Sequence, residues 1–282
     1  MDQFFGNGSA EGYFQHQGVR LRFTVQGEGT PVVLLHGFLG DIETSWIGSP
    51  YGPQPHLLPR LAQRFQVIGL DCRGHGKSDK PHDANQYGLA LAQDVIALLE
   101  HLHLEKAHLV GYSLGALIAG KVLADFPDRL LRVVLGGGAL YAQSLFPQGK
   151  APEDEAMAEE LEQGRGIVSY LLSSAPEGQP KPTREQAEAI SQFVLADKDV
   201  VALTALARGM SGLGVSDAAL QTNRVPTLAL IGTQDEGLER VRYLLTRMAH
   251  LEVQEITGGD HLSTLTHPVF GEAMTAFLEP RP

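Results

Sequence analysis

Short apolar runs alternate with segments of helical hydrophobic spacing through the first half of the chain. Continuous apolar runs are typical of strands buried in a parallel sheet, and apolar residues repeated every three or four positions are typical of helices packed on it. The expected strands cover residues 31–35, 65–70, 106–110 and 130–135, and the expected helices cover residues 56–64, 88–102 and 114–126. This alternation predicts an α/β fold with a doubly wound, mostly parallel sheet.

The pattern changes between residues 139 and 221. This segment shows no convincing strand, and its spacing predicts helices over 151–163, 184–195 and 198–210, with a proline-containing loop over 173–182. A stretch of about 80 residues is too long for an ordinary connection between strands. We therefore expect a helical cap of residues 139–221, inserted into a core of residues 1–138 and 222–282 and lying over the strand ends.

The strand pattern returns after residue 222, with strands expected over 225–232 and 251–256 and helices over 241–248 and 268–278. Near the start of the chain, residues 19–25 alternate between apolar and polar, which predicts a half-exposed strand. Ligands of such sheets bind at the carboxyl ends of the strands. Residues that directly follow a strand are therefore the candidates for chemistry.

Ser113 lies between two glycines at the joint of an expected strand and helix. Residues 111–115 read Gly-Tyr-Ser-Leu-Gly, a G-x-S-x-G motif in the strand–turn–helix context of a nucleophilic serine. Gly111 and Gly115 allow a sharp fold of the backbone, and Ser113 is expected to be strained so that its hydroxyl projects from the sheet. A dinucleotide-binding turn would need G-x-G-x-x-G, which this segment lacks.

Asp235 and His261 also follow expected strands, in the order Ser, acid, His. A serine hydroxyl is a poor nucleophile until a base takes its proton, and that base needs a third group to fix its tautomer. If the strands are parallel neighbours, the three side chains emerge at one edge. We expect Ser113 to be the nucleophile, His261 the base and Asp235 the orienting acid.

Three further residues are rivals for these roles. Glu236 and Asp260 could replace Asp235, although Asp260 adjoins His261 and neighbouring side chains usually diverge. His267 is the rival base, but it precedes the closing helix, where capping is the expected role.

Other polar residues near strand ends are expected to be structural. His36 directly follows a strand, and His75 lies in a glycine-rich turn. Asp71 is expected to cap or to pair with Arg73. Cys72 is expected to be buried and inert.

The chain resembles the α/β-hydrolase family from about residue 19 onward. The matching motifs are His36-Gly37-Phe38, Asp71-x-Arg73-Gly74-His75-Gly76-x-Ser78, Gly111-Tyr112-Ser113-Leu114-Gly115, Gly232-x-x-Asp235 and Gly259-Asp260-His261. The resemblance implies the roles of Ser113, His261 and Asp235 given above, and an oxyanion hole formed by the backbone N–H groups of Phe38 and Leu114. It also implies that His36 pins its loop. The loop after His36 is not of the His-Gly-Gly-Gly type, which favours the smaller capped hydrolases.

The resemblance favours hydrolysis of carboxylic esters with small to medium acyl chains through an acyl-enzyme. Hydrolysis of C–C bonds, lactone opening and perhydrolysis on the same residues are alternatives, as is a receptor-like protein that retains these residues without turnover. C–C hydrolases of the family often carry Asn where Tyr112 stands. Epoxide hydrolases and dehalogenases use an Asp nucleophile, so Ser113 argues against both.

Charge and composition argue against several classes of binding partner. The 282 residues carry a formal net charge of −11, which argues against nucleic acid or an anionic membrane as the main partner. Cys72 is the single cysteine, so no internal disulfide is expected, and neither a metal nor a cofactor is expected. Residues 1–11 lack a secretory pattern, so a cytoplasmic protein is expected. The expected partner is a small-molecule ester, which the resemblance implies. The sequence leaves the oligomeric state open.

Overall fold

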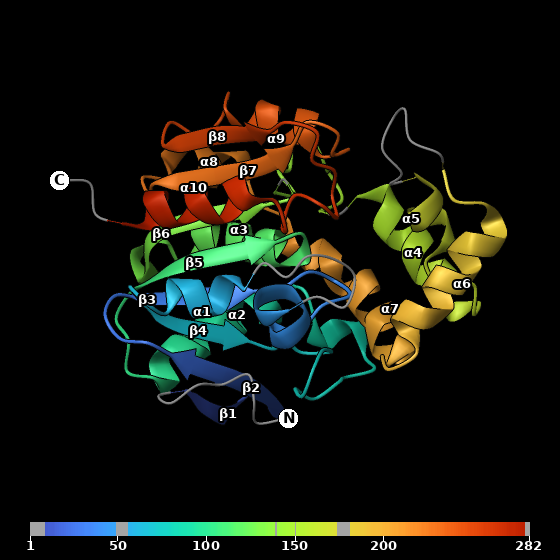
Figure 1. Ribbon diagram of the computed structural model, residues 1–282, viewed down its shortest axis with the longest axis horizontal. Coiled ribbons are helices and arrows are strands. Elements are labelled where there is room, and N and C mark those ends of the chain that lie inside the picture. Colours follow the sequence, from blue (N-terminus) through green and yellow to red (C-terminus); the bar gives the residue numbers. More distant parts are fainter. Residues whose placement is uncertain (1–8, 49–55, 139, 150, 174–180, 280–282) are drawn as a thin grey trace.

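The computed structural model describes residues 9–48, 56–138, 140–149, 151–173 and 181–279. Its centre is an eight-stranded sheet of order β1-β2-β4-β3-β5-β6-β7-β8 (Figure 1). Neighbours from β4 to β8 pair in parallel, and β1 and β2 form an antiparallel edge. The expected doubly wound, mostly parallel sheet is confirmed. The strands are β1 (Ala10–His16), β2 (Val19–Gln26), β3 (Pro31–Leu35), β4 (Gln66–Leu70), β5 (Ala107–Tyr112), β6 (Leu130–Gly136), β7 (Thr227–Gly232) and β8 (Leu251–Ile256).

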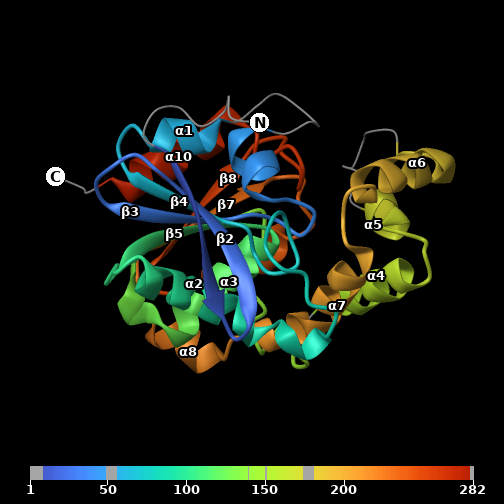
Figure 2. The ribbon, with the colours of Figure 1, turned by 90° about the horizontal axis from the view of Figure 1, so that it is seen from below.

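Helices cover both faces of the sheet (Figure 2). One face carries α1 (Leu57–Leu61) and α10 (Pro268–Leu278), and the other carries α2 (Leu89–His101), α3 (Leu114–Asp125), α8 (Asp217–Thr222) and α9 (Leu238–Leu244). Each face has its own buried apolar core. All six residues of β5 and of β7 are buried, which is why these strands read as continuous apolar runs. Short helical turns cover Glu43–Ile47, Ala84–Gln86, Pro127–Arg129 and Met210–Leu213.

Strand β1 was not expected from the sequence. It pairs with β2 along its whole length, from Ala10 opposite Val25 to His16 opposite Val19. Only Phe14 of its seven residues is buried. A strand at the edge of a sheet that buries one side chain leaves almost no hydrophobic pattern to detect.

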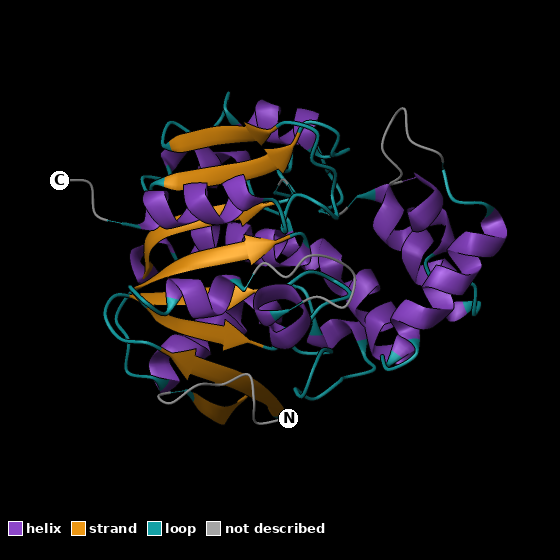
Figure 3. Ribbon diagram, in the orientation of Figure 1, coloured by secondary structure: helices purple, strands orange, loops and turns teal. Residues whose placement is uncertain are grey.

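Four helices between β6 and β7 project beyond the sheet, on the side toward which the arrowheads of the parallel strands point (Figures 1 and 3). They have a small buried core of their own, made by Leu161, Ile167 and Leu203. Helix α5 was not expected, and most of the expected loop over residues 173–182 lies outside the described residues. The helices are α4 (Pro152–Glu162), α5 (Val168–Ser173), α6 (Arg184–Leu195) and α7 (Val200–Gly209).

The rest of this segment packs on the sheet core. Leu140, Tyr141 and Leu220 belong to the same buried cluster as helix α3. The two connections to the projecting helices pair through a bridge between Ala142 and Val215. Within the described residues, no helix has both the length and the apolar character needed to cross a bilayer.

Candidate active site

Ser113 occupies a sharp turn between β5, which ends at Tyr112, and α3, which begins at Leu114. Its φ of 55° and ψ of −115° are a conformation that a residue with a side chain rarely adopts. The turn is so tight that a Cβ on Gly111 would lie 2.0 Å from the carbonyl oxygen of Gly115. A Cβ on Gly115 would in turn lie 2.2 Å from the carbonyl oxygen of Leu35, so the strained serine and the need for both glycines agree with the sequence prediction.

The side chains of Ser113, His261 and Asp235 form a continuous chain of hydrogen bonds. The distance from Ser113 Oγ to His261 Nε2 is 3.0 Å, and that from His261 Nδ1 to Asp235 Oδ2 is also 3.0 Å. The other carboxylate oxygen of Asp235 accepts from the backbone N–H of Gly237 at 2.8 Å. The Asp235 side chain is 1% exposed and that of His261 is 19% exposed, so the carboxylate is enclosed while the imidazole stays partly open to solvent.

These contacts assign the imidazole tautomer. The ionised carboxylate of Asp235 can only accept, so Nδ1 of His261 carries the hydrogen and donates it. Nε2 is then the acceptor for the Ser113 hydroxyl. The arrangement can remove a proton from the serine oxygen and hold it on the ring beside a buried negative charge.

The alternative candidates Glu236, Asp260 and His267 have other surroundings. Glu236 is exposed, and Asp260 accepts from the backbone N–H of Ser263 at 2.7 Å. Nδ1 of His267 accepts from the N–H of Val269 at 3.3 Å, at the start of α10. The expected capping role of His267 is therefore observed.

The loop after β3 passes beside the serine. A Cβ on Gly37 would lie 3.4 Å from Ser113 Cβ. The carbonyl of Gly37 accepts from His36 Nδ1 at 2.8 Å and from the Gly40 N–H at 3.0 Å. Because a trans peptide is planar, fixing this carbonyl also fixes the Phe38 N–H, which points in the opposite direction.

Helix α3 supplies a second amide beside the serine. The Leu114 N–H belongs to the first turn of the helix, so it has no acceptor within the helix, and it lies at the positive end of the dipole. Phe38 and Leu114 thus provide the amides that were expected from the sequence. Their role toward an oxyanion remains a prediction.

Two buried histidines support this loop. His36 Nε2 accepts from the Cys72 N–H at 3.0 Å, and His75 Nε2 lies 2.7 Å from the Phe38 carbonyl oxygen, to which it donates. Burial lowers the pKa of His36 and lowers the pKa of His75 to about 3, so both rings stay neutral near pH 7. Burial also raises the pKa of the Cys72 thiol, consistent with an inert cysteine.

The pairing expected between Asp71 and Arg73 is wrong, whereas the capping role given as the alternative is observed, since the Asp71 carboxylate accepts from the backbone N–H groups of Ile42 and Lys77, both at 2.9 Å. Asp71 Oδ2 accepts from the Arg22 guanidinium at 3.0 Å. Arg73 donates through Nε and Nη2 to the two carboxylate oxygens of Asp94. Arg22 also contacts Glu43 and is fully buried. Sequence reasoning missed Arg22 because β2 alternates apolar and polar residues, so its position looks as solvent-facing as that of the exposed Arg20, and its buried partner Asp71 lies 49 positions away.

The projecting helices reach the site through α5. The ring of Tyr170 meets the imidazole of His261 edge-on, with ring centroids 6.4 Å apart. Phe38 and Leu39, in the loop after β3, pack against the small core of these helices. The helices therefore contact both the His261 side chain and the loop that carries the Phe38 amide.

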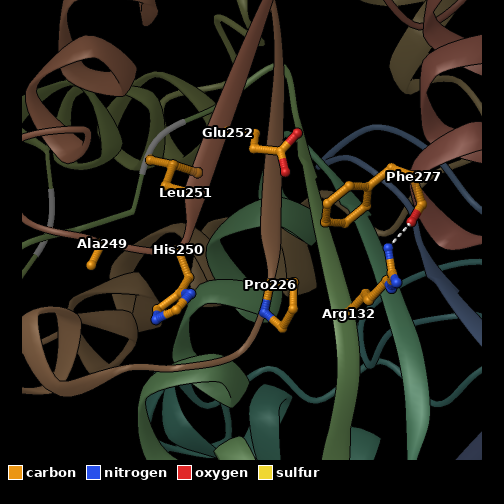
Figure 4. Close-up of a pocket in the computed structure, with 7 residues that line it drawn as sticks. All are labelled: Arg132, Pro226, Ala249, His250, Leu251, Glu252 and Phe277. Carbon is orange, nitrogen blue, oxygen red and sulfur yellow. Dashed lines mark hydrogen bonds between the residues drawn. The ribbon is translucent and has the colours of Figure 1, made fainter. Parts of the chain in front are cut away.

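A separate hollow lies at the opposite end of the strands. It has a volume of about 370 Å³, and Arg132 on its wall donates to the Phe277 carbonyl at 2.6 Å (Figure 4). It contains none of the three site side chains. Its lining residues are Arg132, Pro226, Ala249, His250, Leu251, Glu252 and Phe277. In the described part of the chain, no cluster of three His, Cys, Asp or Glu residues could hold a metal ion.

Several known proteins are similar to this chain over most of its length. The RutD protein of Caulobacter vibrioides, which carries the name of a carbamate hydrolase, is 26% identical over 89% of this chain and 91% of its own length. A thermophilic esterase from Thermogutta terrifontis has a TM-score of 0.74 at 26% identity, covering 94% of this chain and 96% of the other. Est816, described as an N-acyl homoserine lactone degrading enzyme, has a TM-score of 0.73 at 25% identity, covering 94% and 100%.

Other relatives match over a shorter segment. An uncharacterized protein of Mycobacterium tuberculosis is 38% identical over 50% of this chain but only 40% of its own length. The chain spans less than half the length of the first curated relatives that it matches. The family model described as the alpha/beta hydrolase fold matches residues 30–185, more than half of the sequence. The chain therefore belongs to the α/β-hydrolase family.

Proposed function

We propose that the protein hydrolyses carboxylic esters with small to medium acyl chains through an acyl-enzyme. The observation that carries the proposal is the chain of two 3.0 Å contacts from Ser113 through His261 to Asp235. It joins a nucleophile, a base and an orienting acid, as acyl transfer requires. In this proposal the three residues form a catalytic triad.

The reaction proceeds in two halves. Ser113 Oγ attacks the ester carbonyl carbon as His261 Nε2 takes its proton, and the N–H groups of Phe38 and Leu114 donate to the oxyanion. Collapse of this intermediate expels the alcohol, which receives the proton from His261. Water, deprotonated by the same nitrogen, then attacks the acyl-enzyme, and the carboxylic acid leaves as Ser113 regains its proton.

Lactone opening is the second candidate. It breaks the same acyl–oxygen bond with the same groups, except that the alcohol stays attached to the acyl part. The similarity to Est816 at 25% identity favours this candidate over C–C hydrolysis or perhydrolysis. A fold shared by many activities does not choose between linear esters and lactones.

The projecting helices serve in this proposal as a cap that limits substrate size. Tyr170 lies against His261, and Phe38 packs on the core of the same helices. A cap in this position encloses an apolar space above the serine. Short soluble acyl chains fit such a space better than emulsified fats.

The test is turnover of p-nitrophenyl esters and of N-acyl homoserine lactones by the purified protein. Ser113→Ala should reduce kcat by more than ~10³-fold with an unchanged circular dichroism spectrum, because only binding and oxyanion stabilisation remain. Near-normal turnover by folded Ser113→Ala would end the nucleophile assignment. Ligand binding without any turnover by the wild-type protein would favour the receptor-like alternative.

A further inference from the structure

Tyr112, the residue before Ser113, is joined to the backbone of the segment that carries His261. Its hydroxyl donates a 2.6 Å hydrogen bond to the carbonyl oxygen of His261. Two consecutive residues therefore hold the base, Ser113 through the imidazole ring and Tyr112 through the main chain.

The Tyr112 ring is fixed in place by its surroundings. It packs edge-on against Phe270 of α10, with centroids 5.7 Å apart, and is buried. The end of β6 leaves no spare room, because a Cβ on Gly136 would lie 2.7 Å from Cδ2 of Tyr112 and one on Gly137 would lie 2.5 Å from Cζ. The ring therefore has little room to move, which keeps the hydroxyl at the His261 carbonyl.

The segment that it holds belongs to no helix or strand. Residues 261–266 form turns, in which the Asp260 carboxylate accepts from the N–H groups of Leu262 and Ser263, and Leu262, next to His261, is 65% exposed. Burial raises the pKa of Tyr112 well above its ordinary value, so the hydroxyl keeps its hydrogen and remains a donor near neutral pH.

We propose that Tyr112 is a positioning residue that holds the His261 main chain so that Nε2 stays within reach of Ser113 Oγ. The proposal rests on the proposed function and deepens it by assigning a task to the residue before the nucleophile. Tyr112 touches no reacting atom. It would instead set the fraction of time that the His261 ring spends within reach of Ser113 Oγ. Small displacements of a catalytic group from its productive position lower kcat strongly.

Tyr112→Phe removes the hydroxyl and keeps the ring. We expect kcat to fall about tenfold while KM changes less than twofold, because substrate contacts are untouched. Tyr87→Phe is the matched control, since the Tyr87 hydroxyl also donates at 2.6 Å to a backbone carbonyl, that of Pro81, and Tyr87 is equally buried. The control should lose comparable thermal stability and keep kcat within twofold. Equal kcat in the two variants would overturn the proposal.

Gly137→Ala displaces the ring without removing the hydroxyl, and so provides a second variant should Tyr112→Phe not fold. It combines a methyl group 2.5 Å from Tyr112 Cζ with a φ of +56°. Gly18→Ala imposes the same backbone strain at a φ of +77° with nothing within 4 Å. We expect a several-fold loss of kcat in Gly137→Ala alone. Identical kcat in both alanine variants would contradict the positioning role.

A measurement without substrate separates this proposal from the proposed function. Nitrogen-15 spectra of the His261 imidazole report whether Nδ1 keeps the hydrogen and whether the ring holds one position. Tyr112→Phe should broaden or shift these signals, and Tyr87→Phe should not. If no ester or lactone is turned over but this difference is seen, the proposed function fails and the positioning role stands. Unchanged His261 signals in Tyr112→Phe would overturn the positioning role, whatever the activity.

Discussion

Gly115 lies so close to the end of β3 that a Cβ on it would be 2.2 Å from the carbonyl oxygen of Leu35. The start of α3 therefore rests directly on the backbone of the neighbouring strand. This contact brings the Ser113 turn next to the loop that follows Leu35, where Gly37 and Phe38 lie. The glycine thus sets the spacing between the Ser113 turn and the Phe38 amide.

Gly115→Ala should destabilise the fold by on the order of 3 kcal/mol, because backbone atoms of β3 cannot move aside as a side chain can. Gly271→Ala is the control, since it is also helical and would mainly meet the flexible end of Leu57. The control should cost less than about 1 kcal/mol. Urea unfolding of both variants measures the difference, and equal stabilities would show that the turn relaxes freely.

His261→Ala should be as damaging as loss of the serine, with kcat reduced by more than ~10³-fold. His267→Ala should keep activity and lose about 1 kcal/mol of stability, because it removes the acceptor for the Val269 N–H at the start of α10. Groups that act as one unit are non-additive, so Ser113→Ala/His261→Ala should be little worse than either single variant. An inactive His267→Ala would reverse the assignment of the base.

The strands that precede Ser113, Asp235 and His261 could be predicted because each is buried at least in part. Strands β5 and β7 are apolar throughout, and Ser113 and Asp235 follow them closely in sequence. Strand β8 was found from its apolar ends, although three of its six residues are exposed. Once parallel neighbours are assumed, the meeting of the three side chains follows from the geometry of the sheet.

The missed features depend on contacts between distant positions. The Arg22–Asp71 pair and the Tyr112–His261 hydrogen bond join residues 49 and 149 positions apart, and nothing local marks them. Arg73 was assigned to Asp71 because the two are close in sequence, but the α2 residue Asp94 faces its guanidinium instead. Burial selects such partners, because a fully buried charge needs a close opposite charge.

Tyr170→Ala should broaden the range of acyl chains that the protein accepts. The ring contacts His261 from the projecting helices, so its removal opens the space above the base. We expect kcat/KM to rise for octanoyl relative to butyryl p-nitrophenyl esters by several-fold. Val201→Ala, at an exposed position of α7, is the control and should leave this ratio unchanged. Faster hydrolysis of emulsified long-chain triglyceride than of short soluble esters by the wild type would contradict a size-limiting cap.

His108 should make the fold sensitive to mild acid. Burial, with a smaller effect of the Arg132 charge, lowers the pKa of His108 to about 4. The unfolded chain binds a proton at this residue below about pH 6.5 and the folded chain does not, so stability falls as the pH drops from 6.5 toward 4. The contribution at pH 5 is on the order of 1–2 kcal/mol. His108→Leu should reduce the difference in urea stability between pH 7.5 and pH 5 by this amount, and an unchanged difference would show that the ring is protonated when folded.

Asp235→Asn should lower kcat/KM by a factor on the order of 10²–10⁴ without loss of the fold. The amide oxygen would keep the hydrogen bond from the Gly237 N–H, which directs the NH₂ group toward His261 Nδ1. Nδ1 would then have to accept, the hydrogen would move to Nε2, and Nε2 could no longer take the proton of Ser113. The same change in the triad of a serine protease costs about 10⁴-fold in kcat for this reason.

Glu236→Gln and Asp260→Asn are the matched controls for Asp235→Asn, because each also turns a carboxylate into an amide. Glu236 is exposed, and Asp260 is bound to backbone amides of its own turn, including that of Ser263. Each control should change kcat/KM by less than about tenfold, within about 1.4 kcal/mol of barrier. All three variants are measured on one ester, with folding followed by circular dichroism. An active Asp235→Asn beside an inactive control would move the acid to the other residue, while the serine and histidine assignments could stand, because neither depends on which carboxylate orients the ring.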